Sequence, residues 1–454
     1  MRFPRAIDVL RSEGPRVFVR AALGHLLDRT KILLRPARFA ELANRRRAGR
    51  ELRLKSRVLT ATPCEITIES TTFCNLKCVM CEHSQDGMVV KRHFPEHLVD
   101  RLAPFISAAS RFQLHSLGEP LMSPAFWKIL ERITTVHRGT PDISFNSNGL
   151  LLSEKNIALL LASKLREINI SFDAATAATY QRIRGGDFDR LVANVANLVR
   201  ARSVARRSDF KIILNMTLMR ANIEELPRFV RLAHRLGADE VSFWGLNEGE
   251  NYERPDWAVT KGDWQFSYGE ESPQHYPNLF AAKVREAVAV ARELSMPLDE
   301  EFKKKVIVGA AGRRADKDYR PHAPSRESSI PATPVPHELV QLKTGGDTGE
   351  VSVERRRIDG ASGIPAPKSA TISKCEAPWR WLVVNNRGDC LPCCYLQGTV
   401  GNLERESVEE IWNGAPMQDL RASIARGEVH PLCQGASCRY VRGASDVEHA
   451  TSSL

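Results

Sequence analysis

The chain has 454 residues, of which 43% are hydrophobic and 26% charged, with a formal net charge of +11. This length allows two domains, or one large domain with an appendage, and a sizeable core. No apolar run approaches the roughly 20 residues that span a bilayer, and the N-terminus lacks the pattern of a signal peptide, so we expect a cytoplasmic protein.

The positive charge is concentrated at the N-terminus. Residues 1–59 contain sixteen Lys or Arg against five Asp or Glu, an excess that equals the net charge of the whole chain. We expect a basic, amphipathic, helical extension over residues 1–60, which leaves room for an acidic partner or a membrane surface. No finger-like or aromatic-rich module accompanies it, which argues against nucleic acid as a partner.

A regular alternation of strands and helices follows the extension. Apolar, β-branched segments predict strands at 65–70, 112–117, 142–146, 167–173, 211–218 and 240–245, and helical patterns lie at 126–136, 153–163, 191–201 and 223–236. Repeated strand–helix units imply a parallel sheet with right-handed crossovers. We predict an α/β fold with a partial (β/α)6, TIM-like barrel; periodicity alone leaves a doubly wound open sheet as the alternative.

Two of the predicted helices carry end signals. Ser153 is a candidate N-cap for the helix that places Leu159, Leu160 and Leu161 on its buried side. Gly237 directly follows another helix, as a C′ glycine does.

The composition divides the chain into five parts. We expect the basic extension at 1–60, the barrel core at 61–308, a flexible linker or insertion at 309–373, a small cysteine-rich α+β module at 374–441, and a tail at 442–454. The linker is assigned because this segment is rich in Arg, Pro, Ser and Gly and has little apolar periodicity. Within the cysteine-rich module, Gly388-Asp389 predicts the turn of a hairpin between residues 381–385 and 390–395.

The most informative motif is Cys74-x3-Cys78-x2-Cys81, directly after the first predicted strand. Iron–sulfur clusters normally take four cysteines, so three thiolates on one loop leave one iron open to a small molecule. The alternative is a zinc site completed by Cys64, but zinc commonly uses paired, CxxC-like cysteines. We expect Cys64 to be a packed core thiol instead.

Polar turns follow the next three strands. Gly118-Glu119-Pro120 follows the second strand, Asn148 the third, and Ser171 and Asp173 the fourth, with Arg184 downstream. Ligands of barrel-like folds bind at the C-terminal ends of the strands. The cysteine loop follows the first strand, so these groups can surround one ligand.

With these motifs the chain resembles the radical SAM superfamily. The resemblance implies that Cys74, Cys78 and Cys81 hold a catalytic [4Fe–4S] cluster whose fourth iron binds S-adenosylmethionine (SAM). Glu119, within Gly118-Glu119-Pro120, would hold the SAM amino group. Ser171 and Arg184 would contact the carboxylate, Asp173 would help with the ribose, and Asn148 belongs to the same SAM-binding set. Such an enzyme reductively cleaves SAM to a 5′-deoxyadenosyl radical, which abstracts a substrate hydrogen. An electron donor such as flavodoxin or ferredoxin is also implied.

The C-terminal cysteines resemble the SPASM/twitch extension of radical SAM enzymes. Its Cys-x(9–15)-Gly-x4-Cys start is matched by Cys375, Gly388 and Cys393. From the resemblance we infer one auxiliary [4Fe–4S] cluster, with Cys375, Cys393, Cys433 and Cys438 as ligands and Cys390 and Cys394 as alternates; a zinc ribbon is the other interpretation. An auxiliary cluster can accept an electron from the substrate radical, so that the substrate is oxidised or coupled.

The sequence leaves the substrate open. A small metabolite, such as a sugar or aminocyclitol, and a peptide or protein side chain both fit, and no residue is assigned to handle substrate protons. The competing class of function is a non-enzymatic zinc protein with a basic arm that binds nucleic acid.

Overall fold

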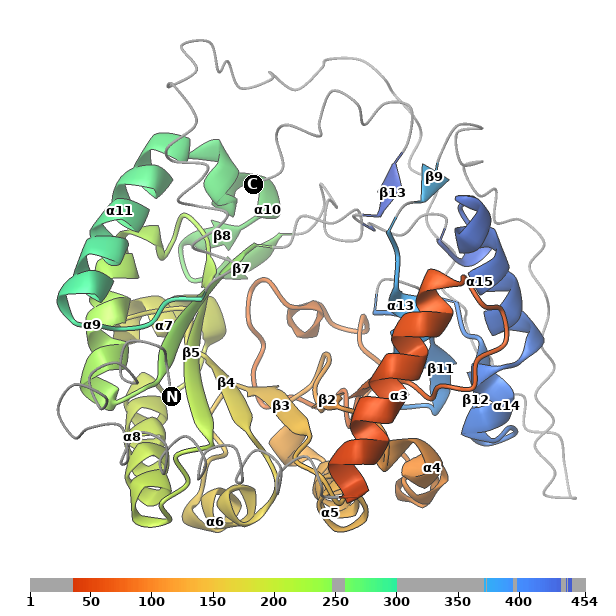
Figure 1. Cartoon of the computed structure of the whole chain (residues 1–454). Coiled ribbons are helices and arrows are strands. Elements are labelled where there is room, and N and C mark those ends of the chain that lie inside the picture. Colours follow the sequence, from red (N-terminus) through yellow and green to blue (C-terminus); the bar gives the residue numbers. More distant parts are fainter. Residues whose placement is uncertain are drawn as a thin grey trace, which may run out of the picture.

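The computed structural model describes residues 36–246, 258–299, 371–372, 374–394, 398–433, 438 and 440–442. At its centre is a nine-stranded sheet with the order β12-β11-β10-β1-β2-β3-β4-β5-β6 (Figure 1). The first 35 residues of the expected basic extension, nearly all of the expected linker at 309–373, and the tail after Arg442 lie outside the described residues.

Six of these strands pair in parallel and follow one another in chain order. They are β1 (Glu65–Ile68), β2 (Arg111–Gln113), β3 (Asp142–Ser147), β4 (Glu167–Ser171), β5 (Lys211–Leu218) and β6 (Glu240–Gly245). The α-helices around them are α4 (Ala103–Ile106), α5 (Pro124–Val136), α6 (Glu154–Ala162), α7 (Ala177–Arg184), α8 (Phe188–Val204), α9 (Leu226–Leu236) and α11 (Pro277–Glu293). All six predicted strands and all four of these predicted helices are confirmed, and a further helical pattern in the sequence, at 278–294, is α11; the sequence does not predict α4 and α7.

The strand order decides between the two expected architectures. A doubly wound sheet reverses its strand order at a switch point, whereas β1 to β6 run in unbroken sequence. The helices therefore cover one side only, and the six strands form the partial barrel that the sequence predicts.

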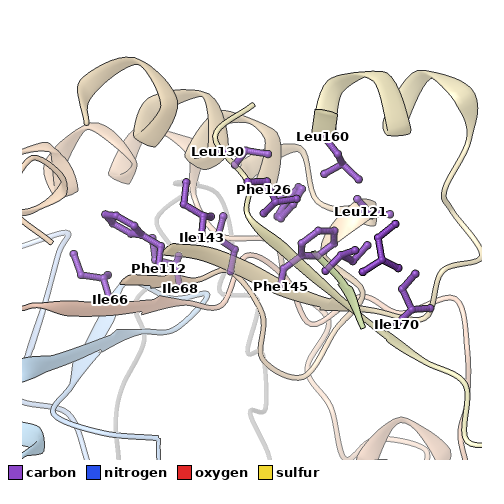
Figure 2. Packing of buried hydrophobic residues seen from close by; sticks show 14 of the residues in the cluster. Ile66, Ile68, Phe112, Leu121, Phe126, Leu130, Ile143, Phe145, Leu160 and Ile170 are labelled. Atoms are coloured by element: carbon purple, nitrogen blue, oxygen red, sulfur yellow. The ribbon is translucent and has the colours of Figure 1, made fainter. Parts of the chain in front are cut away.

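One face of the sheet packs against the helices. Side chains such as Ile66, Phe112, Ile143 and Phe145 meet Phe126 and Leu130 of α5 and Leu160 of α6, as Figure 2 shows. Because successive strand residues point to opposite faces, the residues between these positions lie on the inner face of the barrel.

The end signals of the helices are largely confirmed. The Ser153 hydroxyl accepts a hydrogen bond from Asn156 N at 3.3 Å, and Gly237 adopts a φ of +77°. Leu160 and Leu161 are buried, but Leu159 is 45% exposed, which corrects the expectation for that residue. The helical repeat rotates Leu159 toward solvent, since three consecutive residues cannot share one face.

A small subdomain follows β6 and packs on the cysteine loop. It contains β7 (Val259–Lys261), β8 (Trp264–Phe266) and α10 (Tyr268–Glu271). Val259, Phe266 and Tyr268 belong to the same buried cluster as Val79, which lies between two cysteines of the motif.

The C-terminal cysteine-rich module joins the barrel sheet directly. It contains β9 (Thr371–Ile372), α13 (Ala377–Arg380), β10 (Trp381–Val384), β11 (Asp389–Leu391), β12 (Gly401–Asn402), α14 (Val408–Trp412), α15 (Ala415–Arg426) and β13 (Val441–Arg442). The predicted hairpin is present as β10 and β11, with Gly388 at a φ of +77°. β10 also pairs in parallel with β1, which the sequence analysis did not predict.

The described part of the basic extension is helix α3 (Pro36–Arg53). It lies beside α13 and α15 of the C-terminal module (Figure 1), and its Arg45, Arg46 and Arg47 are exposed. In the part of the chain that the structure describes, no helix is both long enough and apolar enough to cross a membrane.

Candidate active site

The cysteine loop is fixed to the loops on either side of it. Thr72 N donates to the carbonyl of Arg92 at 2.9 Å, and Glu119 N donates to the carbonyl of Phe73 at 2.8 Å. Within the motif, Cys81 N donates to the carbonyl of Cys78 at 2.9 Å. The contact between Glu119 and Phe73 places Cys74 next to the turn after β2.

Gly118 makes this close approach possible. A Cβ atom at this position would lie 2.4 Å from the carbonyl oxygen of Thr71 and 2.7 Å from that of Phe73. Both neighbours are backbone atoms, which cannot move aside as a side chain can. The glycine of the Gly118-Glu119-Pro120 turn is therefore required by sterics.

Glu119 is a buried carboxylate that accepts three hydrogen bonds. Its Oε1 accepts from Ser147 Oγ at 2.9 Å and from Leu121 N at 3.2 Å, and its Oε2 accepts from Asn148 N at 2.7 Å. Burial raises the pKa of Glu119, although these hydrogen bonds act in the opposite direction. Pro120 begins the buried turn η4 (Pro120–Met122) that follows.

Asn148 connects Glu119 to the cysteines. While its backbone binds the carboxylate, its side-chain Nδ2 lies 2.8 Å from Asn75 Oδ1 and 4.0 Å from Cys74 Sγ. The structure thus joins the ends of β1, β2 and β3 in one network, as the position of the motifs predicts.

Asp173 and Arg184 form a second group beside the cysteines. They make a buried ion pair, and Asp173 Oδ1 also accepts from Thr217 N at 2.6 Å. Burial lowers the pKa of Arg184, but the nearby Cys78 and Asp173 outweigh it, so that the pKa lies above its usual value. Arg184 Nε is buried without a hydrogen-bond partner. Ser171, half-buried at the end of β4, pairs in register with Asn215.

The chemistry of the three thiols suits a metal cluster. Burial, together with the proximity of Cys78, raises the pKa of Cys74 to about 11 and that of Cys81 to about 12. A bound cation deprotonates such thiols. Among the described residues, no three His, Cys, Asp or Glu side chains converge as one metal ion would require. A cluster spreads its ligands over several iron atoms, so its cysteines need not converge on one point.

A cleft in the C-terminal module brings together four cysteines. Its lining includes Cys375, Cys393, Cys433 and Cys438, with apolar residues such as Ile372 and Leu420 around them. Burial, and then the proximity of Cys375 and Cys438, raises the pKa of Cys433 to about 12. Cys390 is fully buried on β11 and Cys394 is exposed; neither lines the cleft.

Sequence reasoning missed several residues at this rim. Tyr268, almost two hundred residues further along the chain, donates its hydroxyl to the carbonyl of Met80 at 2.5 Å. His83, two residues after Cys81, is buried, and its Nε2 has no hydrogen-bond partner among the described residues. No motif marks Tyr268, because its contact depends on how the subdomain after β6 folds back. Cys64 lies apart from the motif, packed against Ala48 and Ala61 as expected.

Comparison with known protein families agrees with this geometry. Residues 68–233 match the model of the radical SAM superfamily, and residues 375–439 match the SPASM model, an iron–sulfur cluster-binding domain. The chain belongs to the radical SAM superfamily. It is a radical SAM enzyme with a C-terminal SPASM domain, so the alternative of a non-enzymatic zinc protein is wrong. Its domains imply SAM and iron–sulfur clusters as cofactors.

Individual relatives differ in how much of the chain they match. The chain is 23% identical over 403 residues to the AdoMet-dependent heme synthase of Methanosarcina barkeri, covering 86% of this chain and 95% of that protein. It is 32% identical over 220 residues to the mycofactocin maturase MftC of Mycolicibacterium smegmatis, covering 44% of this chain and 53% of the maturase. This radical SAM enzyme thus spans about half the length of the maturase.

Solved structures share the fold. Streptococcus suis SuiB, crystallised with its precursor peptide SuiA, aligns with a TM-score of 0.50 at 14% identity, covering 83% of this chain and 70% of that chain. The structure of anSMEcpe with bound AdoMet aligns with a TM-score of 0.50 at 15% identity, covering 83% of this chain and 90% of that chain.

Proposed function

We propose that Cys74, Cys78 and Cys81 hold a [4Fe–4S] cluster beside a SAM site built around Glu119. The observation that carries this proposal is the network at the rim. A buried carboxylate, Glu119, is linked through Asn148 to the first cysteine of the motif. A cationic amino group of a ligand is the natural partner for a buried carboxylate.

When bound, the cluster supplies the electron that cleaves SAM to a 5′-deoxyadenosyl radical, which removes a hydrogen atom from the substrate. Glu119 would accept hydrogen bonds from the SAM ammonium, and the free Nε of Arg184 supports a contact with the carboxylate, next to Ser171. Asp173 is fully buried with both oxygens engaged. We therefore assign it the positioning of Arg184, and its contact with the ribose stays a prediction.

We also propose a single auxiliary [4Fe–4S] cluster in the SPASM domain. Support comes from the cleft whose lining contains Cys375, Cys393, Cys433 and Cys438. Four thiolates complete the usual ligand set of a cluster. Such a cluster could accept an electron from the substrate radical, so we propose a net oxidation or coupling of the substrate.

The substrate is a small molecule or a peptide. Among the relatives are mycofactocin maturases and a heme synthase, which is consistent with either class. A flavodoxin or ferredoxin would supply the electron. The exposed arginines of α3 would suit an acidic partner or membrane surface.

Anaerobic reconstitution tests the proposal. The purified protein, supplied with iron and sulfide, should bind about eight iron atoms per chain, as two [4Fe–4S] clusters require, and form 5′-deoxyadenosine from SAM with dithionite. Cys74→Ala should abolish deoxyadenosine formation. Cys375→Ala should lose about half of the iron, retain SAM cleavage, and lose substrate turnover.

Cys64→Ala is the matched control, since Cys64 is a buried cysteine that lies outside both groups of cysteines. It should retain both the iron and the SAM cleavage. Full iron content in Cys74→Ala would overturn the first assignment, and loss of deoxyadenosine formation in Cys375→Ala equal to that in Cys74→Ala would count against an auxiliary redox role.

A further inference from the structure

Apart from Ile213 on β5 and Trp244 on β6, the inner face of the barrel is polar, unlike the face that packs on the helices. In a closed TIM barrel, bulky branched residues fill the interior. Here Asn146 and Asn169 lie side by side in register on β3 and β4. One level nearer the rim, Ser171, Asn215 and Ser242 form a second row across β4, β5 and β6.

Two polar atoms on this face are buried without a hydrogen-bond partner among the residues that the structure describes. Asn215, which is 5% exposed, leaves its Oδ1 unpaired, and His115 at the end of β2 leaves its Nδ1 unpaired. An unpaired buried polar atom costs about 1–3 kcal/mol. A ligand that forms the missing hydrogen bond with either atom would remove this cost.

Each of the six strands begins with a charged residue of this face, at the end away from the rim: four carboxylates (Glu65, Asp142, Glu167 and Glu240) and two cations. The cations that β1 to β6 direct inward are Arg111 and Lys211, which pair with Asp142 at 3.2 Å and with Glu240 at 2.8 Å. Burial lowers the pKa of His115 to about 4, so its imidazole is neutral near pH 7. A phosphate or carboxylate on a substrate would therefore find no free cation on these six strands.

Tryptophans flank the polar surface on both sides. Trp244 on β6 is 45% exposed and donates to Ser242 Oγ at 2.7 Å. Trp381 on β10 donates to Thr67 Oγ1 at 2.9 Å from the other side. Each indole is held by a hydrogen bond, and Trp244 presents open apolar surface next to hydroxyl and amide groups.

We propose that this inner face binds a neutral, hydroxyl-rich small molecule of the sugar or cyclitol class. Amide and hydroxyl side chains can both donate and accept, as the ring hydroxyls of such a ligand require, while its C–H face can lie on Trp244. The inference rests on the proposed function, because it names the substrate class of the same rim.

The β6 edge of the sheet, which borders this face, is partly closed to an added peptide strand. Extended peptides bind by adding a strand to a free sheet edge. At the β6 edge, Val241 N donates to the carbonyl of Pro297 and Asp299 N donates to the carbonyl of Val241, so residues 297–299 already occupy part of that position.

Saturation-transfer NMR on the anaerobically reconstituted, full-length protein tests the inference with three probes. These are myo-inositol, myo-inositol 1-phosphate and the acetylated amide of trialanine. We expect binding of myo-inositol, no tighter binding of its phosphate, and weaker binding of the peptide. Trp244→Ala and His115→Phe should each weaken myo-inositol binding at least fivefold, whereas Leu159→Ala, an exposed leucine on α6, should leave it unchanged.

Several results would overturn the inference: no binding of myo-inositol, tenfold tighter binding of its phosphate, stronger binding of the peptide, or unchanged binding in both variants. SAM cleavage by the wild-type protein, measured without any probe, separates the two proposals. Cleavage without inositol binding refutes only the substrate class, while inositol binding without cleavage refutes the proposed function.

Discussion

The environment of Glu119 determines what this residue can bind. Its carboxylate is almost completely buried and accepts hydrogen bonds only from uncharged donors, Ser147, Asn148 and Leu121. Burial of a carboxylate is costly, and it raises the pKa of Glu119 although these hydrogen bonds and the charge of Arg184 act in the opposite direction. A ligand ammonium would remove this cost, so ligand binding and the ionisation of Glu119 are coupled.

This coupling predicts a pH dependence of SAM binding. Below its raised pKa, Glu119 takes up a proton and loses the charge that attracts the ammonium. The affinity for SAM should therefore fall as the pH falls through that raised pKa, while the ammonium itself stays charged. Glu119→Gln should weaken binding about tenfold or more at pH 8 and remove the pH dependence, as measured by anaerobic calorimetry. The same pH slope in the Gln variant would contradict this assignment.

At this scale the sequence predicts which side chains meet but not how. The Cys74-x3-Cys78-x2-Cys81 spacing and the turn at Glu119 indicate one rim, because both follow neighbouring parallel strands. That Asn148 would use its backbone for Glu119 and its side chain for Cys74 depends on the φ of +75° at Gly149 and on the packing around it. Such details have no signature in one sequence.

Among the secondary-structure elements, the subdomain after β6 has the most direct effect on the cysteine loop. Val79 and Met80, between the second and third cysteines, pack against residues of β7, β8 and α10. Arg182 of α7 lies over the ring of Trp264 at 4.2 Å, which fixes the subdomain to the barrel. The part of the loop between Cys78 and Cys81 is thus covered by residues that lie far away in the sequence.

The variant Tyr268→Phe tests whether the subdomain after β6 holds the cysteine loop in place. The variant keeps the aromatic ring but loses the hydrogen bond to the Met80 carbonyl, at a cost of about 1 kcal/mol. We expect the cluster at Cys74, Cys78 and Cys81 to bleach about five times faster in air. The rate is measured from the visible absorbance of this cluster, in a Cys375→Ala background that lacks the auxiliary cluster. Tyr276→Phe, in the same region but stacked with Arg220, is the control and should bleach at the wild-type rate. Equal rates in all three proteins would show that Tyr268 does not hold the loop.

The elements themselves were largely predictable, but the contact between β1 and β10 was not. Six strands could be predicted because their β-branched segments alternate with helical patterns. β10, which resembles an ordinary hairpin strand in the sequence, pairs in parallel with β1, more than three hundred residues away. Sequence patterns report local structure, whereas this pairing depends on which edge of the barrel remains open.

Across the whole molecule, the N-terminal segment fastens the SPASM domain to the barrel. Residues 56–61 lie against the SPASM domain. Trp379 Nε1 donates to the Ser56 carbonyl and Trp412 Nε1 donates to the Ala61 carbonyl, both at 2.9 Å. Asn413 binds both the N–H and the carbonyl of Leu59 at 2.9 Å. Helix α3 and the segment that follows it therefore link the barrel, which would hold one cluster, to the SPASM domain, which would hold the other.

Arg421 lies at the centre of this connection, so we predict that replacing it destabilises the SPASM domain. Its fully buried guanidinium donates to the carbonyls of Arg57, Pro378 and Trp412 at 2.8–2.9 Å, and burial lowers its pKa to about 9. Arg421→Met keeps much of the volume but leaves three carbonyls unpaired, so the SPASM domain should lose about 3 kcal/mol or more of stability. We expect limited proteolysis to release it at a temperature where the wild-type protein is resistant.

Arg421→Met should lose the auxiliary cluster before the cluster at Cys74, Cys78 and Cys81, because β1 to β6 retain their own core. Iron content and deoxyadenosine formation measure the two sites separately: about half of the iron should disappear while SAM cleavage continues. Arg426→Met is the matched control, since Arg426 lies on the same helix but pairs with Glu428 in solvent. Simultaneous loss of both clusters in Arg421→Met would mean that the barrel depends on the docked SPASM domain for its own stability, since β1 would then need β10 as its neighbour to remain folded.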